Sequence, residues 1–258
     1  MYKLFAIILL LGWSAAYAQT AEERGLEIAI EADKRDNGWQ DQKSDMIMVL
    51  YNRQGQKSER KMHNRSLEIE NDGDKTMIIF GHPRDVKGTA FLTYTHSIRP
   101  DDQWLYLPAL KRIKRISSSN KSGPFMGSEY AYEDLASQEV DKYSYKYIRD
   151  DVYEGRKVFV VERYPAYEHS GYTKQIGYID QEMYQPLKMV FFDRKSAKLK
   201  TLLFQDYRLH LNKYWRANKM RMENHQNGKS TDLVWSNIQF RNGYNEKDFN
   251  KNSLKQAR

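Results

Sequence analysis

The chain contains no cysteine among its 258 residues. Without thiols, the protein cannot form disulfides, bind zinc through thiolates, use a cysteine nucleophile or carry a lipid on an N-terminal cysteine. Long apolar runs are also lacking after residue 18, where the longest spans residues 46–51. A run of that length is far too short to cross a bilayer as a helix. These absences exclude a thiol enzyme, a thiolate metalloprotein and a multispanning helical membrane protein.

The residues that are present combine charge of both signs with enough apolar content for a core. There are 42 Lys and Arg residues against 34 Asp and Glu residues, a net charge of +8, and 40% of the chain is hydrophobic. A modest basic excess mixed with acid disfavours a nucleic-acid-binding protein, which concentrates basic side chains. The 19 tyrosines favour strands and amphipathic surfaces.

The first eighteen residues have the three parts of a secretory signal peptide. Lys3 supplies the positive region, residues 4–12 form a short apolar region, and Ala16-Tyr17-Ala18 offers small residues for cleavage before Gln19. The apolar stretch is shorter than the roughly 20 residues of a membrane-spanning helix. We therefore predict cleavage after Ala18, a periplasmic location without a stable membrane anchor, and a single mature domain over residues 19–258.

Secondary-structure signals favour one helix followed by many strands. Thr20 and Glu23 form a capping box, and Asn37-Gly38 ends the helix that it opens. Tight turns between short adjacent strands indicate an antiparallel meander. Two shorter helical pieces are expected near residues 129–137 and 246–255. The expected strands span residues 45–52, 58–70, 75–81, 89–96, 102–108, 111–116, 157–164, 173–180, 187–193, 198–211, 215–225 and 231–240.

Alternation along residues 198–211 predicts how the sheet is used, because odd positions are mostly apolar and even positions are largely charged. A sheet of about a dozen strands rarely stays open and flat. We predict an α+β, mainly β fold: a half-open antiparallel β-barrel, or strongly curved sheet, with a few helices covering an apolar cavity. The same pattern also fits a closed core. The expected cavity-lining residues are Trp104, Tyr106, Val158, Val160, Leu199, Leu203, Tyr207 and Leu209.

Motifs for catalysis and cofactor binding are lacking in the sequence. The six histidines have no metal-ligand spacing, and no phosphate loop, GxSxG elbow or GxGxxG motif occurs. The acidic pairs Asp101-Asp102 and Glu133-Asp134 are adjacent in sequence, which does not create the facing carboxylates of a glycosidase. Turn and cap roles are the simpler interpretation. We expect no enzymatic activity, no cofactor and no metal.

A basic run follows the strand expected at residues 102–108. Lys111, Arg112, Lys114 and Arg115 surround Ile113. One interpretation is a docking surface for anionic lipid headgroups or an acidic partner. The other is an edge strand that charge protects from aggregation. The sequence leaves both open.

Several blocks together closely resemble the LolA-like outer-membrane lipoprotein-sorting family of exported proteins. They are PDDQWLYLPALKR at residues 100–112, MGSEYAYEDL at 126–135, HPRDVKGTAFL at 82–92, and shorter pieces at 178–180 and 186–188. The likeness covers nearly the whole mature chain. Glu129 stands where the family block leads us to expect Asp.

The resemblance implies a half-open barrel whose apolar cavity shields acyl chains in transit, and a transporter of the resistance-nodulation-division (RND) type as a partner. It supplies no lipoprotein-binding residues that can be carried over. We predict a monomeric periplasmic carrier that binds acyl chains of a lipoprotein or lipid for transfer between membranes. The alternative is a periplasmic accessory subunit of a transporter that carries no lipid. A lipid-modifying or glycan-cleaving enzyme would need convergent polar groups, for which Asp101 and Glu133 would be the candidates.

Overall fold

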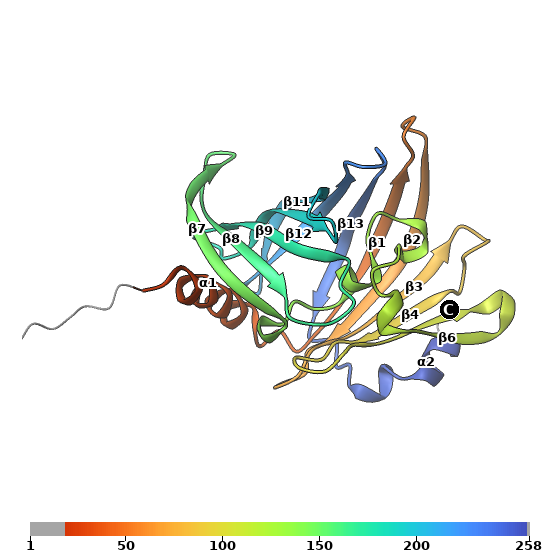
Figure 1. Ribbon diagram of the computed structural model, residues 1–258. Coiled ribbons are helices and arrows are strands. Elements are labelled where there is room, and N and C mark those ends of the chain that lie inside the picture. The colour runs from red at the N-terminus through yellow and green to blue at the C-terminus, as the bar shows by residue number, and fades with distance from the viewer. Residues whose placement is uncertain (1–18, 257–258) are drawn as a thin grey trace, which may run out of the picture.

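Residues 19–256, which the computed structural model describes, form one antiparallel sheet of thirteen strands (Figure 1). The strands run side by side in the order β6-β5-β4-β3-β2-β1-β13-β12-β11-β10-β9-β8-β7. Each half is therefore a meander of sequential neighbours, and pairing of β1 with β13 joins the halves. The strands are β1 (Asp41–Tyr51), β2 (Lys57–Leu67), β3 (Lys75–His82), β4 (Ala90–Tyr94), β5 (Asp102–Leu107), β6 (Arg112–Ile116), β7 (Tyr143–Tyr153), β8 (Arg156–Pro165), β9 (Tyr172–Asp180), β10 (Pro186–Asp193), β11 (Lys198–His210), β12 (Tyr214–Asn224) and β13 (Ser230–Phe240).

The sheet is strongly curved but does not close, because the edge strands β6 and β7 do not pair with each other (Figure 1). This confirms the predicted half-open antiparallel barrel. All twelve predicted strands are present, although β1 begins at Asp41, four residues before the predicted start. The predicted signal peptide, residues 1–18, lies outside the described residues.

Sequence reasoning missed β7, although its first half has a clear strand pattern. Tyr143, Tyr145 and Tyr147 alternate with polar residues. The alternation is interrupted after Tyr147 by a bulge, where the pairing with β8 shifts register before Arg149. The charged residues 149–151 then hide the period of two.

Helices cover both faces of the sheet. α1 (Ala21–Asp36) has the predicted capping box, in which the Glu23 amide donates to Thr20 Oγ1 at 3.1 Å and the Thr20 amide donates to the Glu23 carboxylate at 2.8 Å. Its buried Ile28 packs against Phe159 and Val161 of β8, on the concave side. α2 (Lys251–Gln256) lies against β4 and β5 on the opposite, convex side.

Only short 3-10 turns form in the remaining segments. They are η1 (Pro108–Leu110), η2 (Ser118–Asn120), η3 (Phe125–Gly127), η4 (Tyr132–Leu135), η5 (Val140–Lys142) and η6 (Glu246–Asp248). The helix predicted over residues 129–137 is thus a single turn, η4. Backbone amides in this region form hydrogen bonds outside a helix. The Glu129 amide donates to Thr231 Oγ1 of β13, and the Tyr132 amide donates to the Gly123 carbonyl.

Residues 117–142, here called the crossing segment, run between the two edge strands over the concave face (Figure 1). Phe125 of this segment is fully buried, with its ring centroid 5.0 Å from that of Phe91 and 5.9 Å from that of Phe80. These rings belong to the main core cluster, which draws residues from β1–β6 and β9–β13. The crossing segment therefore fills part of the concave face with its own side chains.

Candidate functional site

The rest of the concave face surrounds a cavity of ≈ 1220 Å³. That volume exceeds the roughly 300–1,000 Å³ of typical small-molecule pockets. The floor is apolar and is formed by several strands, while α1 and the crossing segment form walls. Floor residues include Met46, Ile78, Met189, Phe191, Leu202 and Leu233. A closed core, the other interpretation of the strand pattern, is therefore not what the chain forms.

Among the eight residues predicted to line the cavity, only Tyr207 does so. It lies on β11 after Asp206, whose positive φ of 53° interrupts the alternation of the strand. The Tyr207 hydroxyl donates to the Pro186 carbonyl at 2.6 Å. Before Asp206, the even positions Leu202 and Phe204 line the cavity, which corrects the predicted assignment of faces.

Leu199, Leu203 and Leu209 of the same strand do not line the cavity. Leu199 packs against the main core cluster, and Leu209 is 45% exposed near the end of β11. The prediction failed because it extended one period of two over the whole strand, across the interruption at Asp206.

Trp104 and Tyr106 lie on the convex face. Both belong to the cluster that the C-terminal segment covers with Phe249 and Leu254. The alternate residue Gln103 points the other way, since its side-chain amide donates to the Tyr132 carbonyl of the crossing segment at 2.9 Å. The prediction assigned these aromatic residues to the wrong face of the sheet, because both faces of β5 are covered by other segments.

Val158 and Val160 form a separate buried cluster with Met183 and Leu187. Val161, the alternate residue of β8, lines the cavity instead. Both sets are apolar, because each face of β8 is covered by other side chains. The sequence pattern therefore could not say which set faces the cavity.

Buried polar contacts attach the crossing segment to the second half of the sheet. Lys200 Nζ lies 2.7 Å from Asp134 Oδ2 and donates to the Glu129 carbonyl at 3.0 Å. Glu133 accepts from the Gly171 amide at 2.8 Å and from Ser170 Oγ at 2.9 Å. The Ala131 amide donates to Asp134 at 2.7 Å, which is the cap role expected for this acidic pair.

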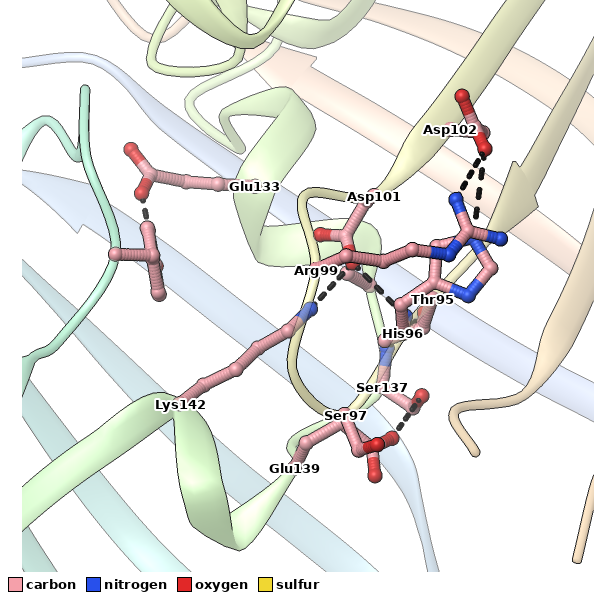
Figure 2. A network of polar contacts seen from close by, with 12 residues as sticks. Thr95, His96, Ser97, Arg99, Asp101, Asp102, Glu133, Ser137, Glu139 and Lys142 are labelled. Carbon is pink, nitrogen blue, oxygen red and sulfur yellow. Dashed lines mark hydrogen bonds and ion pairs between the residues drawn. The ribbon is translucent and has the colours of Figure 1, made fainter. Parts of the chain in front are cut away.

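A second network attaches the end of the crossing segment to the turn between β4 and β5 (Figure 2). Lys142 forms a buried ion pair with Asp101, and the Ser137 amide donates to Thr95 Oγ1 at 3.0 Å. Asp101 also accepts from the His96 amide at 3.1 Å, the expected turn role. Asp101 and Glu133 are thus occupied in separate structural networks and do not face each other as an acid–base pair (Figure 2).

The cavity opens where its lining residues become exposed: at α1, the β2–β3 turn, the β4–β5 turn and the end of the crossing segment. Ile98 of the β4–β5 turn is 88% exposed there. Carboxylates gather around this opening, and we call them the acidic rim. They are Asp33, Asp36, Glu68, Glu70, Asp72, Asp74, Glu139 and Asp141. Sequence reasoning missed the rim because its members are spread over segments that only the fold brings together.

Burial is the main influence on the pKa values of three rim carboxylates. Burial, and next the charge of Glu139, raise the pKa of Asp74 to about 8. Burial also raises the pKa of Asp36, although Arg216 lies 2.6 Å away and opposes the shift. Burial raises the pKa of Glu139 as well. Buried carboxylates with raised pKa values are frequent at functional sites.

The basic run occupies β6, an edge strand of the sheet, as one interpretation expected. Lys111, Arg112 and Lys114 are exposed, whereas Arg115 pairs with Asp102 at 2.7 Å. Other exposed cations lie on the alternate hairpin turns at the same end of the sheet, and we call the whole set the basic hairpin end. It comprises Arg53, Lys57, Arg84, Lys87, Lys111, Arg112, Lys114, Lys195, Lys198 and Lys229.

Within residues 19–256, no helix is long and apolar enough to cross a membrane. The same residues contain no group of three or more His, Asp or Glu side chains that could hold a metal ion.

Comparison with known proteins gives the family. A family model described as "Uncharacterized protein" matches residues 72–256. A Vibrio parahaemolyticus domain named for outer membrane lipoprotein sorting is 57% identical, with a TM-score of 0.89 and coverage of 91% of this chain and 99% of that chain. A DUF1329 family protein from Desulfovibrio piger is 28% identical, with a TM-score of 0.86 and coverage of 92% and 100%.

A LolA superfamily protein from Nitrosomonas europaea shares the fold at 19% identity, with a TM-score of 0.71 and coverage of 92% of this chain and 100% of that chain. No curated protein matches the chain. The matching family model, together with the identity and coverage of the Vibrio domain, confirms the family predicted from the sequence blocks. The chain therefore belongs to the same outer-membrane lipoprotein-sorting family as the Vibrio domain, and its fold is LolA-like.

Proposed function

We propose that the protein is a periplasmic carrier that binds acyl chains of a lipoprotein or lipid in its concave cavity for transfer between membranes. The observation that carries this proposal is the open cavity of ≈ 1220 Å³ with an apolar floor. Burial of each acyl methylene contributes about 0.8 kcal/mol, so several methylenes supply useful affinity without any covalent step. The name of the Vibrio relative supports the same role.

Residues 19–258 would act as one carrier domain after cleavage at Ala18, without a stable membrane anchor. The polar networks around Asp101 and Glu133 support a binding protein rather than an enzyme, because their carboxylates are occupied in holding the crossing segment. An RND-type transporter is the partner we propose for the monomer.

The basic hairpin end would dock on anionic lipid headgroups. Its exposed cations stand on turns remote from the acidic rim, and Leu110 at the β5–β6 turn is 63% exposed beside them. Lysine and arginine near an anionic membrane surface contribute about 1 kcal/mol each. Arg115 takes a lesser part, because Asp102 already neutralises it.

Displacement of a fluorescent fatty-acyl probe, together with native mass spectrometry of protein from its own host, tests the carrier. Met220→Trp places a larger side chain in the cavity lining and should weaken probe binding at least about tenfold, or about 1.4 kcal/mol. Leu209→Trp is the matched control, because Leu209 lies outside the lining. Failure of the wild-type protein to bind any acyl probe would refute the carrier.

The accessory-subunit alternative predicts a different result. A protein of that kind would bind no acyl probe, and reversal of charge at Lys111 and Lys114 would abolish capture of the transporter. The open cavity favours the carrier, since an accessory subunit needs no such space.

A further inference from the structure

The acidic rim is surprising in a chain whose net charge is +8. Its members come from α1, from the β2–β3 turn and from the end of the crossing segment. Glu70 and Asp141 are exposed, and neither side chain makes a hydrogen bond or ion pair with any of residues 19–256. The fold therefore concentrates negative charge at the opening of the cavity while the excess of positive charge lies elsewhere.

The cations that line the cavity leave most of this charge unbalanced. Only Arg163 and Arg216 line it among the described residues. Arg216 is paired with Asp36 at 2.6 Å. Arg163 donates to Gln175 at 2.7 Å and lies 4.4 Å from the centroid of the Tyr143 ring. Neither guanidinium is hydrogen-bonded to Asp74, Glu139 or the exposed rim carboxylates.

Two polar groups deeper in the cavity lining are independent of the rim. Tyr130 is 2% exposed, and its buried hydroxyl has no hydrogen-bond partner among residues 19–256. Asn64 Oδ1 is likewise buried and without a partner in that range. Both residues line the cavity. A buried polar atom without a partner is costly, and such atoms are uncommon in native proteins, so each is available to a water or a ligand that enters the cavity.

The exposed rim carboxylates and the two buried polar atoms can all accept hydrogen bonds. The exposed carboxylates of Glu70 and Asp141 and the Asn64 amide oxygen accept hydrogen bonds, and the Tyr130 hydroxyl can accept as well as donate. A ligand that satisfies the acceptors must bring hydrogen-bond donors, and a cationic N–H group is the donor that also complements the negative charge of the rim. A positively charged ligand would also be attracted by the exposed rim carboxylates Glu70 and Asp141.

We infer that the cavity selects amphiphiles whose head carries a positive charge and N–H donors, with the apolar tail on the cavity floor and the amine between the acidic rim and the Tyr130–Asn64 pair. This inference rests on the proposed carrier function and adds the chemical class of the head group. An anionic head at the same position meets like charge and cannot donate to the Asn64 amide oxygen, and therefore binds more weakly.

Three detergents with the same dodecyl tail test the inference: dodecylamine, neutral dodecyl maltoside and dodecyl sulfate. Each is titrated below its micelle concentration against the wild-type protein by displacement of a neutral fluorescent acyl probe. At low salt, dodecylamine should bind about tenfold more tightly than the maltoside, or about 1.4 kcal/mol, and the sulfate more weakly. The difference should shrink as salt screens the rim.

Substitutions in the rim and at Tyr130 test whether these residues cause the preference for the amine. Glu70→Gln combined with Asp141→Asn should remove most of the preference for the amine while leaving maltoside binding unchanged. Glu154→Gln combined with Glu168→Gln is the matched control, because it removes two exposed acids outside the cavity lining. Tyr130→Phe should also reduce amine binding.

The outcomes separate the two proposals. Equal binding of the three detergents, tighter binding of the sulfate, or an amine preference that survives Glu70→Gln/Asp141→Asn would overturn the head-group inference and leave the carrier intact. Binding of none of them would refute the carrier itself.

Discussion

Lys200 of β11 and Asp134 of the crossing segment form an ion pair, with Nζ 2.7 Å from Oδ2 and side chains that are only 5% and 6% exposed. The Tyr172 hydroxyl donates to the same carboxylate at 2.8 Å. The pair joins the crossing segment to the second half of the sheet. It therefore maintains the boundary between the filled part of the concave face and the cavity.

Removing one partner of this pair should strongly destabilise the fold. We expect Lys200→Met to lower the free energy of unfolding by about 3–5 kcal/mol, because the Asp134 carboxylate is left buried without its cation. The double variant Lys200→Met/Asp134→Leu should lose less than the single variant. Urea unfolding measures both, and a loss below about 1 kcal/mol for Lys200→Met would show that water replaces the lysine.

Trp104 should matter for stability and not for binding. Trp104→Ala removes a large buried side chain beneath the C-terminal segment, with an expected loss of about 3–5 kcal/mol. Acyl-probe affinity of the folded fraction should stay at the wild-type value, whereas Leu202→Ala, in the cavity floor, should change it. Thermal unfolding and probe titration of the two variants distinguish the faces, and weaker probe binding by Trp104→Ala would contradict the assignment.

Asp74 should make the protein less stable as pH rises. Its pKa is about 8 in the folded protein against an ordinary value of 3.8, so the folded state holds this proton more tightly. The contribution to stability is fully present below about pH 4 and is lost as pH rises through about 8. Asp74→Asn should flatten this dependence in urea unfolding between about pH 5 and pH 8. Asp33→Asn, on the exposed part of the rim, is the control, and an unchanged slope in Asp74→Asn would contradict the assignment.

The basic hairpin end should bind anionic vesicles. Lys111→Gln combined with Lys114→Gln should weaken sedimentation with phosphatidylglycerol vesicles by about 2 kcal/mol, at about 1 kcal/mol per lysine. Lys34→Gln combined with Lys255→Gln removes the same charge from exposed helical positions and should have little effect. Equal loss in both double variants would reveal attraction by net charge alone, and capture of an acidic protein without vesicle binding would favour the edge strand as a protein-docking site.

The sequence by itself determined the local structure. The period of two predicted twelve strands, the Thr20 and Glu23 capping box placed the start of α1, and sequential turns implied the antiparallel meander. These features depend on neighbouring residues, for which backbone geometry and side-chain alternation are sufficient. The two longest family blocks besides residues 82–92 cover β5 with its flanking turns and part of the crossing segment, and they contain Asp101 and Asp134, which hold the fold together.

Only the tertiary structure decided which apolar residues face the cavity and where its charge lies. Trp104 and Leu105 are both buried, because α2 covers one side of β5 and the crossing segment covers the other. The alternation of residues along β5 therefore does not show which face lies on the cavity side. The positive φ of Asp206 changes the face that β11 presents. The acidic rim draws on residues from Asp33 to Asp141, which are neighbours only because the sheet curves and brings distant segments to one opening.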